Sequence, residues 1–140
     1  MVGNPRYVDI NIFVYWLGNH PKFGPTAQKW IKKIEESQRG DYITSTLTLY
    51  ETLVILAGLT GKNLKDKTFV NQVLNALTSL KPLRIEPLRI EDYNKAADLM
   101  NECQLDYEDS LHLAVAIRAK AEEIVSNDKD FDITQIKRTF

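Results

Sequence analysis

Short apolar runs typical of β-strands alternate with longer helical patterns along the chain, and this alternation constrains the fold most strongly. We expect strands at residues 6–10, 42–44, 83–86 and 124–126, with a further edge strand after Asp132. The spacing of apolar residues predicts helices at 11–17, around 27–34, and at 46–59, 69–77, 93–103 and 108–120. Gly40 and Gly61 are expected to end the second and third helices. This order predicts an α/β domain with a mainly parallel sheet.

The chain has the size and composition of one folded domain, spanning residues 1–140. Hydrophobic residues make up 44% and charged residues 26%, both near the globular average, so disorder is not expected. A single cysteine, Cys103, excludes a disulfide framework within the chain. Two histidines are too few for most zinc sites.

The net charge and the hydropathy pattern limit where the protein can reside and which partners it can bind. The net charge of -1 counts against a protein that only coats nucleic acid, but less against a nuclease, whose metal-binding acids offset its basic residues. The N-terminus lacks the basic and apolar regions of a signal peptide. The longest apolar stretch, 53–59, is too short to span a bilayer. We therefore expect a soluble, cytoplasmic protein.

The polar residues near the carboxyl ends of the strands are the candidates for function, because ligands bind there in open parallel sheets. Asp9 ends the first strand. Taken by itself, this position is better explained as the N-cap of the following helix.

Glu51 is harder to explain structurally, because it is the only charged residue between Tyr42 and Gly61. A helix that is apolar almost all round is expected to be buried. A buried carboxylate is costly unless a cation or a basic partner neutralises it. The alternative is a position at a gap in the core, from which Glu51 reaches solvent.

Asp109 opens the sixth helix in a run of acids that could simply favour the helix dipole. Residues 111–119 are apolar apart from His112 and Arg118, so this helix is also expected to be buried. Because it leads into the strand at 124–126, its N-terminus should lie at the carboxyl edge of the sheet, beside Asp9.

Asp128 follows the last predicted strand, where a polar turn would also explain it. The alternating acids at 128, 130 and 132 suggest a calcium loop, but an EF-hand requires Gly and Glu where Ile133 and Thr139 stand. That alternative is rejected.

Together, Asp9, Glu51, Asp109 and Asp128 place acids from four segments at one edge of one sheet. Carboxylates so close together repel one another unless they bind divalent cations. An all-oxygen ligand set favours Mg²⁺ or Mn²⁺, which can activate water for phosphodiester hydrolysis. The sequence contains neither a phosphate-binding glycine loop nor a nucleophile elbow.

Four segments resemble the PIN domain family, and in particular the VapC-type toxins of prokaryotic toxin–antitoxin pairs. They are residues 7–11, the Thr44-Ser45-Thr46 run with Glu51, residues 108–114 and residues 126–131. The resemblance covers essentially the whole chain. It implies a three-layer sandwich with a four- or five-stranded, mainly parallel sheet between helices, and Mg²⁺- or Mn²⁺-dependent cleavage of RNA.

The resemblance also assigns roles to individual residues. It implies that the catalytic metal ligands are Asp9, Glu51, Asp109 and Asp128, with Asp130 assisting. Asn11 and Ser126 match small polar positions beside the acids, where they would hydrogen-bond to the ligands. We expect the extra acid Asp106 to be a cap, and His112 to be a helix-face residue rather than a catalytic base.

The family resemblance further implies a homodimer and a small antitoxin partner. The helices at 46–59 and 68–80 offer more apolar surface than one small core needs. Other possibilities are a PIN nuclease of RNA processing without an antitoxin, and a non-catalytic module that binds RNA or protein. A phosphatase or receiver domain is disfavoured, because a phosphatase of the haloacid type would need a second Asp where Asn11 stands.

The sequence gives only weak indications of which residues would contact RNA. Tyr15 and Trp16, near Asp9, could stack on bases. Candidate phosphate-binding residues are Lys22, Lys62, Lys65, Arg118 and Lys129.

Overall fold

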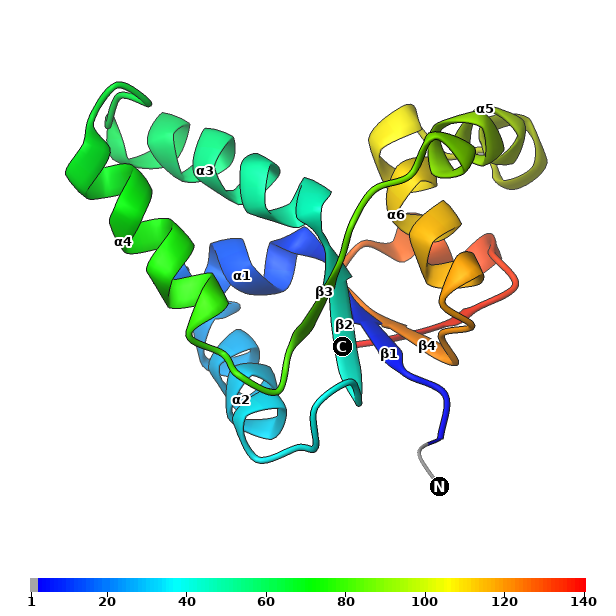
Figure 1. Ribbon diagram of the computed structural model, residues 1–140, viewed down its shortest axis with the longest axis horizontal. Coiled ribbons are helices and arrows are strands. Elements are labelled where there is room, and N and C mark those ends of the chain that lie inside the picture. Colours follow the sequence, from blue (N-terminus) through cyan, green and yellow to red (C-terminus); the bar gives the residue numbers. More distant parts are fainter. Residues whose placement is uncertain (1–2) are drawn as a thin grey trace.

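The computed structural model describes residues 3–140 and contains a five-stranded parallel sheet with the strand order β3-β2-β1-β4-β5 (Figure 1). The strands are β1 (Arg6–Val8), β2 (Tyr42–Ser45), β3 (Arg84–Glu86), β4 (Glu123–Val125) and β5 (Lys137–Thr139). The tail after Asp132 thus adds the expected edge strand, β5, which pairs with β4. The expected α/β sandwich with a four- or five-stranded sheet is confirmed.

Within residues 3–140, six α-helices and one short 3-10 helix connect the strands. They are α1 (Ile10–Leu17), α2 (Gly24–Glu35), α3 (Thr46–Thr60), α4 (Lys67–Thr78), α5 (Ile90–Cys103), α6 (Tyr107–Arg118) and η1 (Lys129–Ile133). Among residues 3–140, no helix combines the length and the apolarity needed to cross a membrane.

The sheet separates two hydrophobic cores, because successive side chains of a strand point to opposite faces. Val8 and Val125 pack with helices α1 to α4 on one face. Tyr7 and Ile124, their neighbours in sequence, pack with α5 and α6 on the other. Figure 1 shows the same division, with α1 to α4 on the left of the sheet and α5 and α6 on the right.

Several strand and helix ends can be compared with the predicted ones. The first strand is shorter than the predicted 6–10, because the Asp9 carboxylate accepts a hydrogen bond from the Ile10 backbone N–H and starts α1 there. Gly61 ends α3 in the left-handed conformation, with φ of 67°, as expected. Gly40, with φ of 91°, does not end α2, which stops at Glu35. It lies in the turn before β2.

The N-terminus of α3 has no side-chain cap. Ser45 occupies the N-cap position, but its side chain makes no capping hydrogen bond. Its hydroxyl instead accepts a hydrogen bond from the Tyr7 hydroxyl. The Thr46 hydroxyl accepts one from the Leu88 backbone N–H. Both side chains therefore connect α3 to neighbouring segments.

The two helices expected to be buried behave differently. In α6, every residue from Ser110 to Ala116 is buried, as predicted. In α3, however, four large apolar side chains are exposed: Tyr50, Val54, Ile55 and Leu59. The prediction that α3 is buried almost all round is therefore wrong, because one side of the helix faces solvent.

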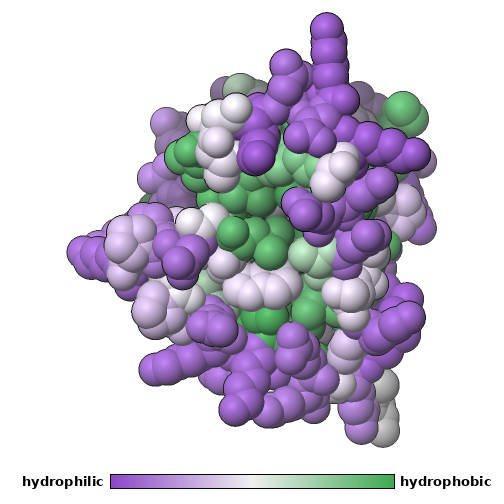
Figure 2. All heavy atoms as spheres, turned by 90° about the vertical axis from the view of Figure 1, so that its left-hand side faces the viewer, coloured by the Kyte–Doolittle hydropathy of each residue, from purple (hydrophilic) through white to green (hydrophobic). Residues whose placement is uncertain are grey.

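The outer face formed by α2 and α4 is hollowed beside Trp16. Two cavities, of about 570 and 580 Å³, meet at Trp16 and Glu35. Ile31 and Leu80 contribute apolar walls. Figure 2 shows apolar side chains gathered at the centre of this face, with hydrophilic ones around them.

Candidate metal centre

The acidic residues gather where the strand order of the sheet changes direction. β2 and β3 follow β1 on one side, whereas β4 and β5 lie on its other side. β1 and β4 are paired through Val8 and Val125, and the Asp9 N–H donates to the Val125 carbonyl at 2.9 Å. The segments after both strands therefore emerge side by side, at the position where open α/β sheets bind ligands.

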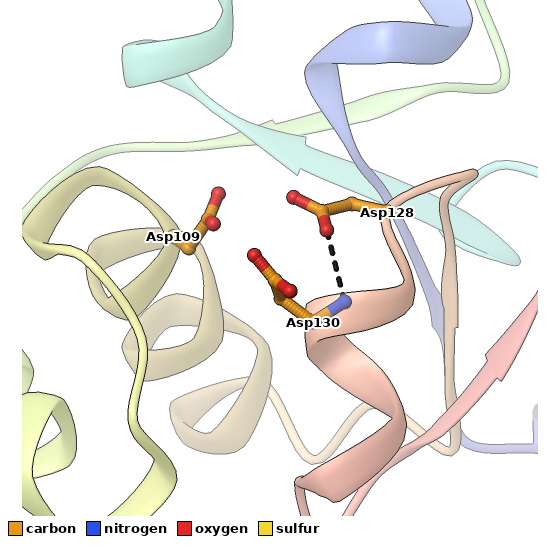
Figure 3. A group of neighbouring side chains, drawn as sticks. All are labelled: Asp109, Asp128 and Asp130. Carbon is orange, nitrogen blue, oxygen red and sulfur yellow. Dashed lines mark hydrogen bonds between the residues drawn. The ribbon is translucent and has the colours of Figure 1, made fainter.

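Three carboxylates converge at this edge, from Asp109, Asp128 and Asp130. One oxygen of each lies within 4.8 Å of the others. Figure 3 shows Asp109 on α6 facing Asp128 and Asp130 across the start of η1. The Asp128 carboxylate accepts a hydrogen bond from the Asp130 N–H at 2.9 Å, so it also caps η1. Asp128 thus has both the turn geometry and the neighbours of a metal ligand.

Asp9 is almost fully buried and lies outside this group of three, but it is close enough to Asp109 for its charge to raise the pKa of that residue. Its Oδ1 accepts from the Ile10 N–H at 2.8 Å, and its Oδ2 accepts from the Ser126 hydroxyl at 2.7 Å. Burial raises the pKa of Asp9, although the charge of His112 and these hydrogen bonds oppose the rise. Asp9 is therefore both the N-cap of α1 and a carboxylate held at the acidic edge.

Asn11 and Ser126 connect the residues of this edge. The Asn11 amide donates to the Ser126 hydroxyl at 3.0 Å and to Asp9 Oδ2 at 3.4 Å. The Ser126 hydroxyl also accepts from the Asp128 N–H at 3.0 Å. The loop after β4 is thus tied to the end of β1 through one hydroxyl and one amide.

The acidic environment acts most strongly on Asp109. Burial, followed by the charges of Asp9, Asp106 and Asp128, raises the pKa of Asp109 to about 8. A divalent cation would relieve this repulsion, because its charge favours the ionised carboxylate.

Glu51 is not part of the group formed by Asp109, Asp128 and Asp130. It is 9% exposed on α3, and its Oε1 lies 2.5 Å from His112 Nε2. Burial raises the pKa of Glu51, but the hydrogen bonds to His112 and Glu108 outweigh it and hold the pKa below its ordinary value. A basic partner, one of the possibilities that the sequence left open for Glu51, is therefore present, and it comes from α6.

Glu108 is exposed and lines the same cavity as Glu51. The hydrogen bond between the two carboxyl groups and the charge of Glu51 raise the pKa of Glu108 to about 7. The pair borders a cavity of about 310 Å³ whose other walls are apolar residues of α3, including Tyr50 and Val54.

The contacts of His112 with Tyr7 and Glu51 were not predicted from the sequence. His112 is 1% exposed and lies between Glu51 and Tyr7, whose hydroxyl is 2.6 Å from His112 Nδ1. Its pKa is well above the ordinary value: burial alone would lower it, but Tyr7, Glu51 and Asp9 raise it more strongly. A sequence signal existed, because His112 is three residues after Asp109 and so shares its helix face.

Two other residues singled out in the sequence have structural contacts. Asp106 caps α6, as expected, by accepting from the Asp109 N–H at 2.8 Å. Arg118, a candidate phosphate-binding residue, forms two hydrogen bonds of 2.9 Å with Asp92 and one with the Pro87 carbonyl. Its guanidinium is therefore committed to the fold.

The fold and this acidic edge define a class of protein. A model of the PIN domain matches residues 6–137, and the chain belongs to the PIN domain family. No curated protein shows significant sequence similarity to the chain.

Solved structures of toxin–antitoxin proteins share this fold. VapC20 of Mycobacterium tuberculosis, described as a toxin that cleaves the sarcin-ricin loop, aligns with a TM-score of 0.74 and 17% identity, over 94% of this chain and 95% of that one. VapBC2 of Rickettsia felis, bound to a promoter DNA fragment, gives 0.67 and 19% over 96% of each chain. FitAcB of Neisseria gonorrhoeae gives 0.64 and 17% over 96% of each. At these identities the likeness concerns the fold.

Proposed function

We propose that the protein is an endoribonuclease that uses Mg²⁺ or Mn²⁺ to hydrolyse RNA phosphodiester bonds. The observation that carries this proposal is the convergence of Asp109, Asp128 and Asp130 at the carboxyl ends of the paired strands β1 and β4. Membership of the PIN domain family is consistent with it.

The donor set fits a hard divalent cation. All three converging side chains are carboxylates, and a fourth carboxylate, Asp9, acts electrostatically on Asp109. Oxygen ligands favour Mg²⁺ or Mn²⁺ over zinc. Oxygens that bind one Mg²⁺ lie about 3 to 4 Å apart, so the three carboxylates are close to the required spacing. Burial and the charges of Asp9, Asp106 and Asp128 raise the pKa of Asp109, and a bound divalent cation would oppose this rise.

The individual residues would have different roles in this reaction. Asp9, Asp109 and Asp128 would hold the metal with Asp130. Glu51, whose charge acts on Asp9 from α3, would be a further ligand. Asn11 and Ser126 orient Asp9 and the loop that carries Asp128. A bound divalent ion would activate water and stabilise charge on the leaving oxygen.

We further propose that the protein is the toxin of a toxin–antitoxin pair. Several structural relatives are toxin–antitoxin complexes. The hollow between α2 and α4 has an apolar floor at Trp16, and Lys29, Lys32 and Lys81 line it together with Glu35. Such a surface suits an amphipathic segment of an antitoxin with acidic flanks. A PIN nuclease of RNA processing remains the alternative, in which the hollow has no protein partner.

The decisive experiment is cleavage of a labelled mixed RNA by the purified protein, with Mg²⁺, Mn²⁺ or EDTA. We expect cleavage that requires metal and that is lost in Asp109→Asn and Asp9→Asn. Asp98→Asn is the matched control, because Asp98 is an exposed carboxylate on α5. Full activity of both aspartate variants would refute the proposal. Metal binding without cleavage of any RNA would favour a binding module.

A further inference from the structure

A continuous chain of buried hydrogen bonds runs from the sheet to Glu51. The Tyr7 hydroxyl on β1 donates to the Ser45 hydroxyl at 2.9 Å and lies 2.6 Å from His112 Nδ1. His112 Nε2 lies 2.5 Å from Glu51 Oε1. Tyr7, Ser45 and His112 are each no more than 1% exposed. These hydrogen bonds thus connect β1, β2, α6 and α3 inside the protein.

The number of available hydrogens fixes the direction of these bonds. Tyr7 has one hydroxyl hydrogen, and this hydrogen is used in the bond to Ser45. The Tyr7 oxygen therefore accepts from His112 Nδ1. An ionised Glu51 can only accept, so His112 Nε2 must donate as well. Both ring nitrogens are donors, and their two acceptors fix the plane and orientation of the ring.

The position of His112 suits a role in holding Glu51. His112 lies on α6 three residues after Asp109, and so on the same helix face. Its ring meets that of Tyr7 edge-on, with the centroids 5.7 Å apart. A glutamate side chain has several rotatable bonds and would otherwise sample many orientations.

We propose that His112, itself held by Tyr7, is a positioning residue that fixes the Glu51 carboxylate at the acidic edge for RNA cleavage. The inference rests on the proposed function and adds two residues to it. Partners that orient metal-ligating side chains typically change metal affinity or activity about 10- to 100-fold when they are removed.

Two amide variants separate this role from general packing. In His112→Gln the amide nitrogen can reach the position of Nε2 and keep the bond to Glu51. In His112→Asn it can reach only the position of Nδ1, near Tyr7. Both variants place a neutral amide in the same buried site, so we expect them to fold comparably. Their melting temperatures measure any difference in stability.

The readouts are kcat and KM for RNA cleavage and the Mn²⁺ concentration for half-maximal activity. We expect His112→Asn to lower kcat about 10- to 100-fold and to raise the Mn²⁺ requirement, with little change in the KM for RNA. His112→Gln should recover most of the loss. Equal activity of the two variants, after correction for folded fraction, would overturn the proposal.

Tyr7→Phe provides a second test that preserves the packing of the ring. It removes only the hydroxyl that holds His112, so we expect a smaller loss of kcat, about 3- to 10-fold, in the same direction. Wild-type kcat and Mn²⁺ dependence in Tyr7→Phe would exclude Tyr7 from the role.

The proposed function and this inference can fail separately. If the wild-type protein cleaves no RNA, the ribonuclease proposal fails, and direct Mn²⁺ binding by calorimetry then tests His112. Weaker Mn²⁺ binding in His112→Asn than in His112→Gln would still support positioning of Glu51. Equal Mn²⁺ binding would overturn it.

Discussion

Ser126 and Asp9 are joined by a hydrogen bond of 2.7 Å between the serine hydroxyl and Asp9 Oδ2. The same hydroxyl accepts from the Asp128 N–H at 3.0 Å. One buried oxygen thus connects the carboxylate at the end of β1 with the loop that carries Asp128 and Asp130. The relative position of these acids depends on this oxygen.

Replacing Ser126 should therefore disturb the metal centre. In Ser126→Ala, Asp9 Oδ2 loses its closest donor and the Asp128 N–H loses its acceptor. We expect Mn²⁺-dependent cleavage to fall about 10- to 100-fold, measured as initial rates over a Mn²⁺ titration. Ser126→Thr keeps the hydroxyl and serves as the control. An alanine variant with wild-type Mn²⁺ dependence would show that the hydroxyl does not support the site.

The pKa of Asp109 predicts how stability depends on pH. In the unfolded chain this carboxyl has a pKa of about 3.9, and in the folded protein the pKa is about 8. Between these values the folded state retains a proton that the unfolded state has released, so the metal-free protein loses stability as the pH rises. Glu108, with a pKa of about 7, acts in the same direction.

Divalent metal should reverse this trend, because it binds the ionised carboxylates. We expect the melting temperature in EDTA to fall from pH 5 to pH 8, and the stabilisation by Mn²⁺ to grow over the same interval. Asp109→Asn should flatten the EDTA curve and lose most of the Mn²⁺ effect. A melting temperature in EDTA that rises over this interval would contradict the assigned pKa.

The positions of Asp9, Asp109 and Asp128 could be predicted because topology determines them. Asp9 and Asp128 follow adjacent parallel strands, and α6 leads into one of those strands. Parallel strands bring their carboxyl ends to one edge, whatever the details of packing. Local patterns therefore sufficed for these three acids.

The environment of Glu51 could not be predicted in this way. Its partner His112 is distant in sequence, and their contact depends on how closely α3 approaches α6. Likewise, the apolar pattern of α3 does not distinguish core residues from surface ones, and Tyr50 is 63% exposed. Arg118 illustrates the same limit, since only the packing of α5 on α6 reveals Asp92 beside it.

The role of Arg118 can be tested against that of Lys129. Arg118→Met leaves the buried Asp92 without its bidentate partner and should cost about 2 to 3 kcal/mol of folding free energy, measured by urea unfolding. The KM for RNA of the folded fraction should not change. Lys129→Ala, at an exposed position between Asp128 and Asp130, should do the reverse: unchanged stability, a higher KM and a weaker salt dependence. A large increase in KM for Arg118→Met alone would reinstate it as a phosphate contact.

The exposed side of α3 predicts how the protein self-associates. Tyr50 and Val54 lie one helical turn apart, as do Ile55 and Leu59, and all four are more than a third exposed. In the described part of the chain, α4 contributes none of the exposed large hydrophobic residues, so of the two helices first considered only α3 offers such a surface. A contiguous apolar stripe of this kind is typical of an interface.

We therefore expect a homodimer in solution, and we expect Val54→Lys to convert it to a monomer by placing a charge within the interface. Analytical ultracentrifugation over a range of protein concentrations measures the change. Leu64→Lys is the matched control, because Leu64 has the same 42% exposure but lies beyond α3. Since Val54 is already exposed, its replacement should shift the monomer's stability by no more than about 0.5 kcal/mol. A Val54→Lys protein that stays dimeric would place the interface elsewhere on the surface.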